Sequence, residues 1–332
     1  MRSVLLTSLA FALVLPIAVS AQSLGNLPGD ASSLFTISVS PQYPAPGSQA
    51  TLSFLSSSLD LTSSMLKVSV NGSNIYQGSV RPVAVPLGKA GSVTKIIVML
   101  SSGGTNYFQT LSIQPQDVVL IAEPLSSAPV LYPGKPLVPL EGDVRIVAIA
   151  NVRNASGKAV SPSALSYSWT VDGVQIANSS GIGKSAVIVA SPLQYRARDV
   201  SVSVMSPDGN LVGGDSLSLS PQEPSIRLYE NDPLLGIRFD RALSDTYTID
   251  GTEATLYAAP FSLPTTNGLP FIQWFLNGSA AQTGNLITLR PSGSGQGSAS
   301  LSLTASAGGN TPAATNLSLI FGATRSSNFF GL

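Results

Sequence analysis

Apolar and polar residues alternate along several short stretches of the chain. In "VSVSV" (200–204) and "LSLT" (301–304), valine or leucine occupies one set of positions and serine or threonine the other. A period of two is the pattern of a strand that buries one face. No run after residue 21 has the period of an amphipathic helix. The pattern therefore predicts an all-β protein built from short strands.

Three alternating stretches lead directly into a hairpin signal. They are "LKVSVNG" (66–72), "YSWTVDG" (167–173) and "FIQWFLNG" (271–278). Asn-Gly and Asp-Gly favour a type I′ turn, because both central residues of that turn need positive φ. The residues predicted to form these turns are Asn71, Gly72, Asp172, Gly173, Asn277 and Gly278.

The hairpin phrase belongs to a longer repeat. The turn glycines Gly72, Gly173 and Gly278 are 101 and 105 residues apart. Each is followed by a second alternating run with a glycine turn, and then by a closing run that starts at Leu111, Leu217 or Leu317. Several landmarks with one shared spacing indicate three repeats of a unit of about a hundred residues.

Short strands with frequent turns, repeated three times, predict three tandem β-sandwiches. The joints "QPQD" (114–117) and "SPQEP" (220–224) are short and contain proline, so we expect a semi-rigid extended string whose neighbours touch only at the joints. The proline-rich segment (123–142) is expected to be a surface loop or an irregular edge. The predicted boundaries are a signal peptide 1–21, a linker 22–34, domains 35–116, 117–222 and 223–322, and a tail 323–332.

The strand and turn in "WTVDG" and "WFLNG" resemble strand C and the C–C′ turn of immunoglobulin-like (Ig-like) domains. The later "VSVSVMSPDGN" (200–210) resembles the end of bacterial Ig-like and PKD-type surface repeats. The resemblance implies that Trp169 and Trp274 lie between two sheets, with Val68 at this place in the first repeat. An exposed tryptophan could instead stack against a sugar, but the alternating pattern favours the core. The chain lacks the Ig cysteine pair and is one residue shorter than the PKD motif here, so the resemblance extends to the Ig-like fold and to no subfamily.

The first 21 residues have the features of a secretory signal peptide. Arg2 precedes an apolar run that is broken by Pro16 and followed by small residues up to Ala21, which predicts cleavage before Gln22. The alternative is an uncleaved membrane anchor, which needs about 20 apolar residues. The apolar run here, from Val4 to Val19, is shorter and contains threonine and serine. We therefore expect a secreted, extracellular or cell-surface protein with no transmembrane anchor in the mature chain. The chain has no cysteine, so its domains must be held by burial alone.

Charge and residue types exclude several classes of function. Seventeen basic and seventeen acidic residues cancel, which argues against a nucleic-acid partner. With no histidine and no cysteine, the chain lacks the usual imidazole base, thiolate nucleophiles and zinc ligands. "GIGKS" (181–185) lacks the first glycine and the strand-to-helix setting of a phosphate-binding loop. We therefore predict no enzyme, no catalytic residue and no cofactor.

One acidic stretch leaves an alternative open. Six of the seventeen acids fall within residues 230–253, where they could bind Ca²⁺ through carboxylates. A solvated insertion is the other interpretation, since Arg238 and Arg241 are interleaved with the acids, and paired glycosidase carboxylates are a third. The calcium candidates are Glu230, Asp232, Asp240, Asp245, Asp250 and Glu253.

Taken together, the sequence predicts a secreted or cell-surface, non-enzymatic structural or adhesive protein of bacterial type. The alternative is a binding module whose sandwich-end loops recognise a polysaccharide or another cell-envelope protein.

Overall fold

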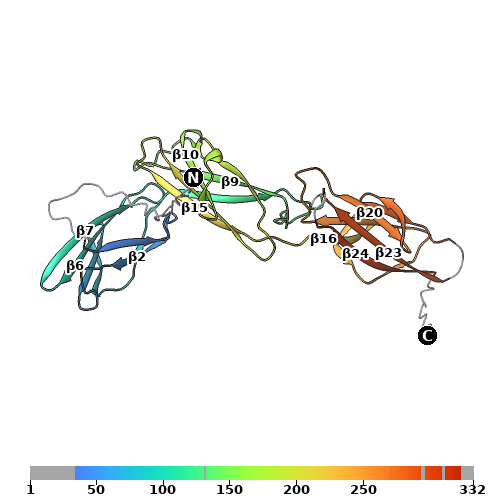
Figure 1. Cartoon of the computed structure of the whole chain (residues 1–332), viewed down its shortest axis with the longest axis horizontal. Coiled ribbons are helices and arrows are strands. Elements are labelled where there is room, and N and C mark those ends of the chain that lie inside the picture. The colour runs from blue at the N-terminus through green and yellow to red at the C-terminus, as the bar shows by residue number, and fades with distance from the viewer. Residues whose placement is uncertain (1–33, 131, 293–295, 309–310, 323–332) are drawn as a thin grey trace, which may run out of the picture. The chain divides into compact units, whose positions relative to one another are not determined.

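The computed structural model describes residues 34–130, 132–292, 296–308 and 311–322 (Figure 1). The predicted signal peptide, the tail and all but the last residue of the predicted linker lie outside these ranges. Within them the regular secondary structure is almost entirely β-strand, with two short 3-10 helices, η2 (Pro162–Ala164) and η3 (Ala177–Ser179). None of these described helical turns has the length and apolar character needed to span a membrane.

The chain divides into two units, with the main boundary between Pro115 and Gln116 and with Ala155–Gly157 assigned to the first unit. The first unit holds one sandwich and the second unit holds two, each sandwich with its own apolar core. The predicted fold class, tandem Ig-like β-sandwiches, is confirmed. The boundaries predicted at individual residues stay predictions.

The first sandwich places a three-stranded sheet of order β1-β2-β5 against a four-stranded sheet of order β4-β3-β6-β7. All neighbouring strands are antiparallel. This division of strands is that of Ig-like sandwiches. The strands are β1 (Thr36–Ser40), β2 (Gln49–Leu55), β3 (Met65–Val70), β4 (Ser73–Ser79), β5 (Val83–Pro86), β6 (Thr94–Ser102) and β7 (Thr105–Ile113).

The second sandwich repeats this plan with sheets β13-β9-β8 and β11-β10-β14-β15, and β12 also pairs with β10. Its closing hairpin joins β14 to β15 over eight residue pairs. The strands are β8 (Asp117–Pro124), β9 (Asp143–Asn151), β10 (Ser166–Val171), β11 (Val174–Gln175), β12 (Gly181–Ile182), β13 (Ala186–Ala190), β14 (Arg198–Met205) and β15 (Val212–Leu219).

The third sandwich has larger sheets, of order β17-β16-β19-β22 and β18-β24-β23-β20-β21. Its additional strands are β17 and β18, and β18 pairs with β24 in parallel. The strands are β16 (Ser225–Asp232), β17 (Gly236–Leu243), β18 (Thr246–Ile249), β19 (Ala254–Phe261), β20 (Phe271–Leu276), β21 (Ser279–Thr283), β22 (Leu286–Leu289), β23 (Gly297–Ser306) and β24 (Ala313–Phe321).

Trp169 on β10 and Trp274 on β20 are fully buried at the centres of the second and third cores. Each indole N–H donates to a main-chain carbonyl: Trp169 Nε1 to Lys184 O at 2.9 Å, and Trp274 Nε1 to Gly284 O at 2.7 Å. Val68 on β3 is fully buried at the corresponding place of the first core. Buried, satisfied indoles stabilise the sandwiches and are not available as platforms for a sugar.

The three hairpin turns share a second contact besides their backbone geometry. Asn71, Asp172 and Asn277 have φ of 49°, 50° and 50°. Each also accepts, through its side-chain oxygen, a main-chain N–H from the start of the adjacent long strand. The donors are Lys95 N to Asn71 Oδ1 (2.9 Å), Asp199 N to Asp172 Oδ1 (3.0 Å) and Ser300 N to Asn277 Oδ1 (2.9 Å).

The repeated phrase thus places a residue that tolerates left-handed φ and also ties the hairpin to the next strand. This double requirement explains why the chain uses Asn or Asp, and no other residue, at all three places.

The proline-rich segment (123–142) is where the structure departs from the sequence-based expectation. It does not lie on the surface of the second sandwich alone, because it pairs with the third. Ser127 N donates to Leu263 O at 2.7 Å, and Ser262 N donates back to Ser127 O at 3.1 Å. Thr265 N donates to Leu125 O at 2.9 Å.

The expectation that neighbouring sandwiches touch only at the joints is therefore wrong for the second and third. Its physical reason is that main-chain groups left free by the prolines of the segment find partners beyond β19, at residues 262–265. Such a long-range pairing leaves no periodic signal in the sequence. We call the contact between residues 125–127 and 262–265 the clamp.

Candidate functional site

A shallow cavity of about 300 Å³ lies at one end of the second sandwich. It is formed by the loop between β13 and β14 together with the chain that leaves β15. Leu140, from the proline-rich segment, completes it. The other lining residues are Gln194, Tyr195, Arg196, Ala197, Ser220, Pro221 and Glu223.

Tyr195 is the most unusual residue of this cavity. Its side chain is 90% exposed, and its φ of 62° is a left-handed conformation that a bulky residue rarely adopts. The turn that holds it is closed by Arg196 N, which donates to Leu193 O at 3.0 Å. An exposed ring held in a strained turn is a feature found at binding sites, where surrounding contacts maintain the strain.

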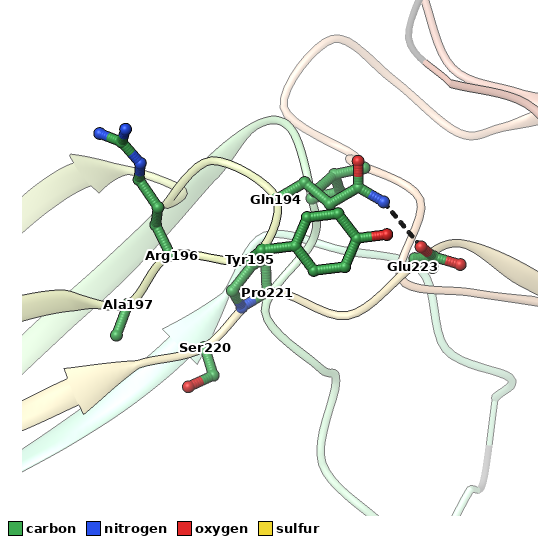
Figure 2. Close-up of a pocket in the computed structure, with 8 residues that line it drawn as sticks. Gln194, Tyr195, Arg196, Ala197, Ser220, Pro221 and Glu223 are labelled. Carbon is green, nitrogen blue, oxygen red and sulfur yellow. Dashed lines mark hydrogen bonds between the residues drawn. The ribbon is translucent and has the colours of Figure 1, made fainter.

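Gln194 and Glu223 form the polar wall of the cavity. Gln194 Nε2 donates to Glu223 Oε1 at 2.7 Å, which ties the loop to the joint after β15 (Figure 2). Figure 2 shows the Tyr195 ring beside this pair, whereas the Arg196 side chain extends away from it. The cavity thus offers an aromatic face, an amide and a carboxylate next to one another.

This combination suits a neutral polyhydroxylated ligand. An aromatic ring can pack against the C–H face of a sugar, and the amide and carboxylate provide both acceptors and a donor for hydroxyl groups. The volume is at the small end of ligand sites, so it would hold a short segment of a larger molecule.

The six acids predicted as calcium candidates do not gather at one place. Among the described residues, no three His, Cys, Asp or Glu side chains lie close enough to hold a metal ion. Asp240 is paired with Arg238 through two hydrogen bonds of 3.0 Å, and these hold the pKa of Asp240 below its usual value. Glu253 accepts from Arg290 Nε at 2.8 Å.

Asp232 has a local structural role at the tip of the β16–β17 hairpin. Its Oδ1 accepts from the main-chain N–H groups of Leu235 and Leu234, both at 2.8 Å, and these bonds lower the pKa of its carboxyl. A carboxylate that orders a turn in this way stabilises the hairpin locally.

The three remaining candidates lie around β18. Glu230 and Asp250 act on the Tyr247 side chain, and Asp245 immediately precedes the strand. Burial, followed by the negative charge of Glu230 and a hydrogen bond to it, raises the pKa of Tyr247 to about 12, with a smaller contribution from Asp250. Asp245 O accepts from Ser318 N at 2.8 Å, which aligns β18 with β24. The six acids therefore serve separate local contacts, and calcium binding stays a prediction that these contacts do not favour.

Sequence reasoning did not identify Tyr195. The stretch "SPLQYRARD" (191–199) contains an aromatic residue between polar ones in a turn region. This pattern is the available sequence signal for an exposed tyrosine. Nothing in that pattern distinguishes an exposed, strained tyrosine from one that folds back onto a sheet.

Comparisons with known proteins find similar solved structures but no similar sequence. No family model matches the chain, and no curated protein matches its sequence. Among solved structures, it is similar to the three N-terminal domains of the highly immunogenic outer capsid protein of bacteriophage RB49, with 12% identity, 88% of this chain and 100% of that chain covered, and a TM-score of 0.24.

A second similar structure is the central fibronectin-III array of RIM-binding protein, with 10% identity, 90% and 100% coverage of the two chains and a TM-score of 0.27. A third is a set of fibronectin(III)-like modules of Clostridium thermocellum CbhA, with 10% identity, 59% and 95% coverage and a TM-score of 0.22. These TM-scores are too low to support a fold assignment. The Ig-like assignment therefore rests on the sheet orders given above.

Proposed function

We propose that this protein is a secreted or cell-surface, non-enzymatic structural or adhesive component built of Ig-like repeats. The observation that carries the proposal is the clamp, in which main-chain hydrogen bonds join the second and third sandwiches. A protein that spaces or connects other components needs its repeats coupled, because independent repeats on flexible linkers do not hold a fixed separation.

The clamp is well suited to that task. Ser126, Ser127 and Leu263 are buried, so the hydrogen bonds between the two sides are shielded from water. Ser127 Oγ also accepts from Leu263 N at 3.1 Å, which adds a side-chain bond to the main-chain pairs.

Two further contacts lie beside the clamp. Tyr132 packs edge-on against Phe261, with ring centroids 5.3 Å apart, and Glu141 accepts from Thr311 N at 3.2 Å. Polar and aromatic contacts thus act together to fix the third sandwich to the proline-rich segment.

Secretion is supported by the leader-like first 21 residues. Bacterial origin is supported by the resemblance to bacterial surface repeats.

Export can be tested with the full chain expressed in a bacterium. We expect N-terminal sequencing of the product to begin at Gln22, with the protein outside the cytoplasm. Leu13→Arg, which interrupts the apolar run, should leave an uncleaved chain inside the cell. An uncleaved wild-type chain found in the cytoplasm would contradict the proposed location.

A second candidate function is recognition of an envelope polysaccharide at the Tyr195 cavity. The exposed ring and its left-handed φ favour it. We expect Tyr195→Asn to weaken retention on insoluble envelope polysaccharide by about tenfold, because asparagine keeps the left-handed turn but removes the stacking face.

Two controls accompany this measurement. Tyr195→Phe should retain binding, since it keeps the ring. Phe271→Ala should also retain it, because that exposed ring lies on the third sandwich, away from the cavity. Equal retention of the wild type and Tyr195→Asn would exclude the site.

A further inference from the structure

Hydroxyl side chains line the outer faces of several sheets. In the first sandwich, Ser40 of β1 lies opposite Thr51 of β2. In the second, Ser168 of β10 lies opposite Ser203 of β14. Serine and threonine at such positions keep an outer face hydrated.

The outer face of the sheet β13-β9-β8 in the second sandwich is apolar instead. The alternate residues Val118, Leu120, Val144, Ile146, Val187 and Val189 point into the core. The residues between them point outward, and they are Val119, Ile121 and Glu123 on β8, Arg145, Val147 and Ile149 on β9, and Ala186, Ile188 and Ala190 on β13. We call these nine residues the β9 face.

The β9 face is open to solvent. Val119 and Ile149 lie directly opposite each other and are 47% and 54% exposed, and Ile188 is 61% exposed. Ile121, Val147 and Ala186 form one row across its centre. A contiguous exposed apolar surface on a globular domain is a feature of interaction sites.

Two other outer faces with apolar residues are covered or interrupted. On the third sandwich, Phe239 of β17 packs edge-on against Tyr229 of β16, with ring centroids 5.2 Å apart, and Tyr229 is 5% exposed. On the first sandwich, Lys67 of β3 and Lys95 of β6 lie among the apolar residues of the outer face. The β9 face has neither a covering strand of this kind nor a lysine at its centre.

Charged and polar groups lie at the two ends of the β9 face and are paired. At the end nearer the clamp, Arg145 forms an ion pair with Glu123, and Asp143 accepts a hydrogen bond from the loop after β19. At the other end, Asn151 Nδ2 donates to Asp117 Oδ2 at 3.3 Å. Because the Arg145 and Glu123 charges cancel, the face offers little to a strongly charged partner.

The backbone under the face is regular. β8 and β9 pair over eight residues and β9 and β13 over five, with no bulge in either ladder. Regular sheets pack face to face about 10 Å apart, with strand directions within about 30° of each other. The face is therefore suited to packing against another sheet.

We propose that the β9 face is a self-association surface, which packs against the β9 face of a second copy of this chain. The two-fold axis passes close to Val147 and perpendicular to the strands, so the strands of the two copies run in opposite directions. The central row of each copy then meets the central row of the other. An apolar centre surrounded by polar groups is the usual anatomy of an interface, and each protomer covers the same residues of the other.

This arrangement also separates like charges. Reversing the strands places the Glu123–Arg145 pair of one protomer opposite Val119 and Ile149 of its partner. The two arginines therefore lie at opposite ends of the interface, and each ion pair stays at its margin, in contact with water. A second copy thus meets the face without electrostatic repulsion.

The size of the face sets the strength that we expect. Strands about 4.8 Å apart, with an outward residue about every 6.8 Å, give nine residues a flat footprint of roughly 300 Å² per copy. Two such faces bury less than the roughly 1,200 Å² of a stable dimer. We therefore expect a weak dimer, with a dissociation constant of about 10–100 µM. The inference does not depend on the proposed location or on the Tyr195 cavity.

The test is the oligomeric state of the chain from residue 22 onward, measured by sedimentation velocity up to concentrations well above that dissociation constant. We expect a monomer–dimer equilibrium. Ile149→Lys should raise the dissociation constant at least about tenfold, because the lysine meets Arg145 of the partner. Ile149→Glu should raise it less, since the same arginine then meets an opposite charge.

A second variant removes apolar surface without adding charge. Val119→Thr/Ile149→Thr gives this end of the face the hydroxyl pattern of the other sheets and keeps two β-branched residues that suit a strand. It should also raise the dissociation constant at least about tenfold, because both copies lose apolar contact. Val174→Lys is the matched control, since Val174 is 66% exposed on the opposite sheet of the same sandwich, and this variant should dimerise like the wild type.

Circular dichroism of every variant checks that the sandwiches are folded. The proposal is overturned by a wild type that is monomeric throughout, by Ile149→Lys or threonine variants that dimerise like the wild type, or by Ile149→Glu that is as impaired as Ile149→Lys. A monomeric wild type that dimerises only after removal of residues 22–33 or 323–332 also overturns it, because that segment would then be the occupant of the face.

Discussion

Replacing Trp169 with alanine is expected to lower the free energy of unfolding of the second sandwich by about 3–5 kcal/mol. The indole is fully buried and is the largest side chain of its core, so its removal leaves a cavity between the two sheets. Its N–H also satisfies Lys184 O, and that carbonyl would lose its partner. Because a domain of this size has about 5–15 kcal/mol of stability, the loss would be a large part of the total.

Urea denaturation followed by fluorescence measures this effect with a built-in reporter. The chain has two tryptophans, so in Trp169→Ala the remaining signal comes from Trp274 alone and reports on the third sandwich. Circular dichroism then detects the early unfolding of the second. Trp169→Phe should lose less, since it keeps most of the volume and gives up the hydrogen bond. A Trp169→Ala chain that unfolds at the wild-type urea concentration would show that the indole does not support the core.

The hairpin turns and the core tryptophans could be predicted from sequence because both are local. An Asn-Gly or Asp-Gly pair fixes the turn, and alternation fixes which side of the strand faces inward. The left-handed φ of Asn71, Asp172 and Asn277 and the burial of Trp169 and Trp274 follow those two rules. The side-chain bonds from the turns to the next strand were not predicted, since their donors lie over twenty residues later in the chain.

The clamp and the Tyr195 cavity could not be predicted, for a related reason. Ser127 and Leu263 are 136 residues apart, and nothing in either stretch marks them as partners. A proline-rich composition indicates that a segment does not pair within its own sheet. It does not indicate what that segment contacts instead. The strain at Tyr195 likewise depends on a backbone angle that its neighbours in sequence do not reveal.

Gly142→Ala is expected to loosen the clamp between the second and third sandwiches. Gly142 has φ of 119°, and an added Cβ would lie 2.7 Å from the Cβ of Pro264, closer than carbon atoms can approach. One side must therefore move, and Pro264 is held between Leu263 and Thr265, whose main-chain groups form the clamp. We expect faster hydrogen exchange at the amides that donate across the clamp, those of Ser127, Ser262, Leu263 and Thr265, by about tenfold or more, which corresponds to roughly 1.4 kcal/mol.

Gly268→Ala separates the clash from the backbone strain. Gly268 has the same φ of 119°, but an added Cβ there meets no atom within 4 Å. Both substitutions carry the cost of an alanine at positive φ, about 1–3 kcal/mol, whereas Gly142→Ala alone drives the two sandwiches apart. Faster exchange in Gly142→Ala than in Gly268→Ala assigns the coupling to the contact with Pro264. Equal exchange in the two variants would mean that the repeats are held together elsewhere, and the structural role proposed for the clamp would fail with it.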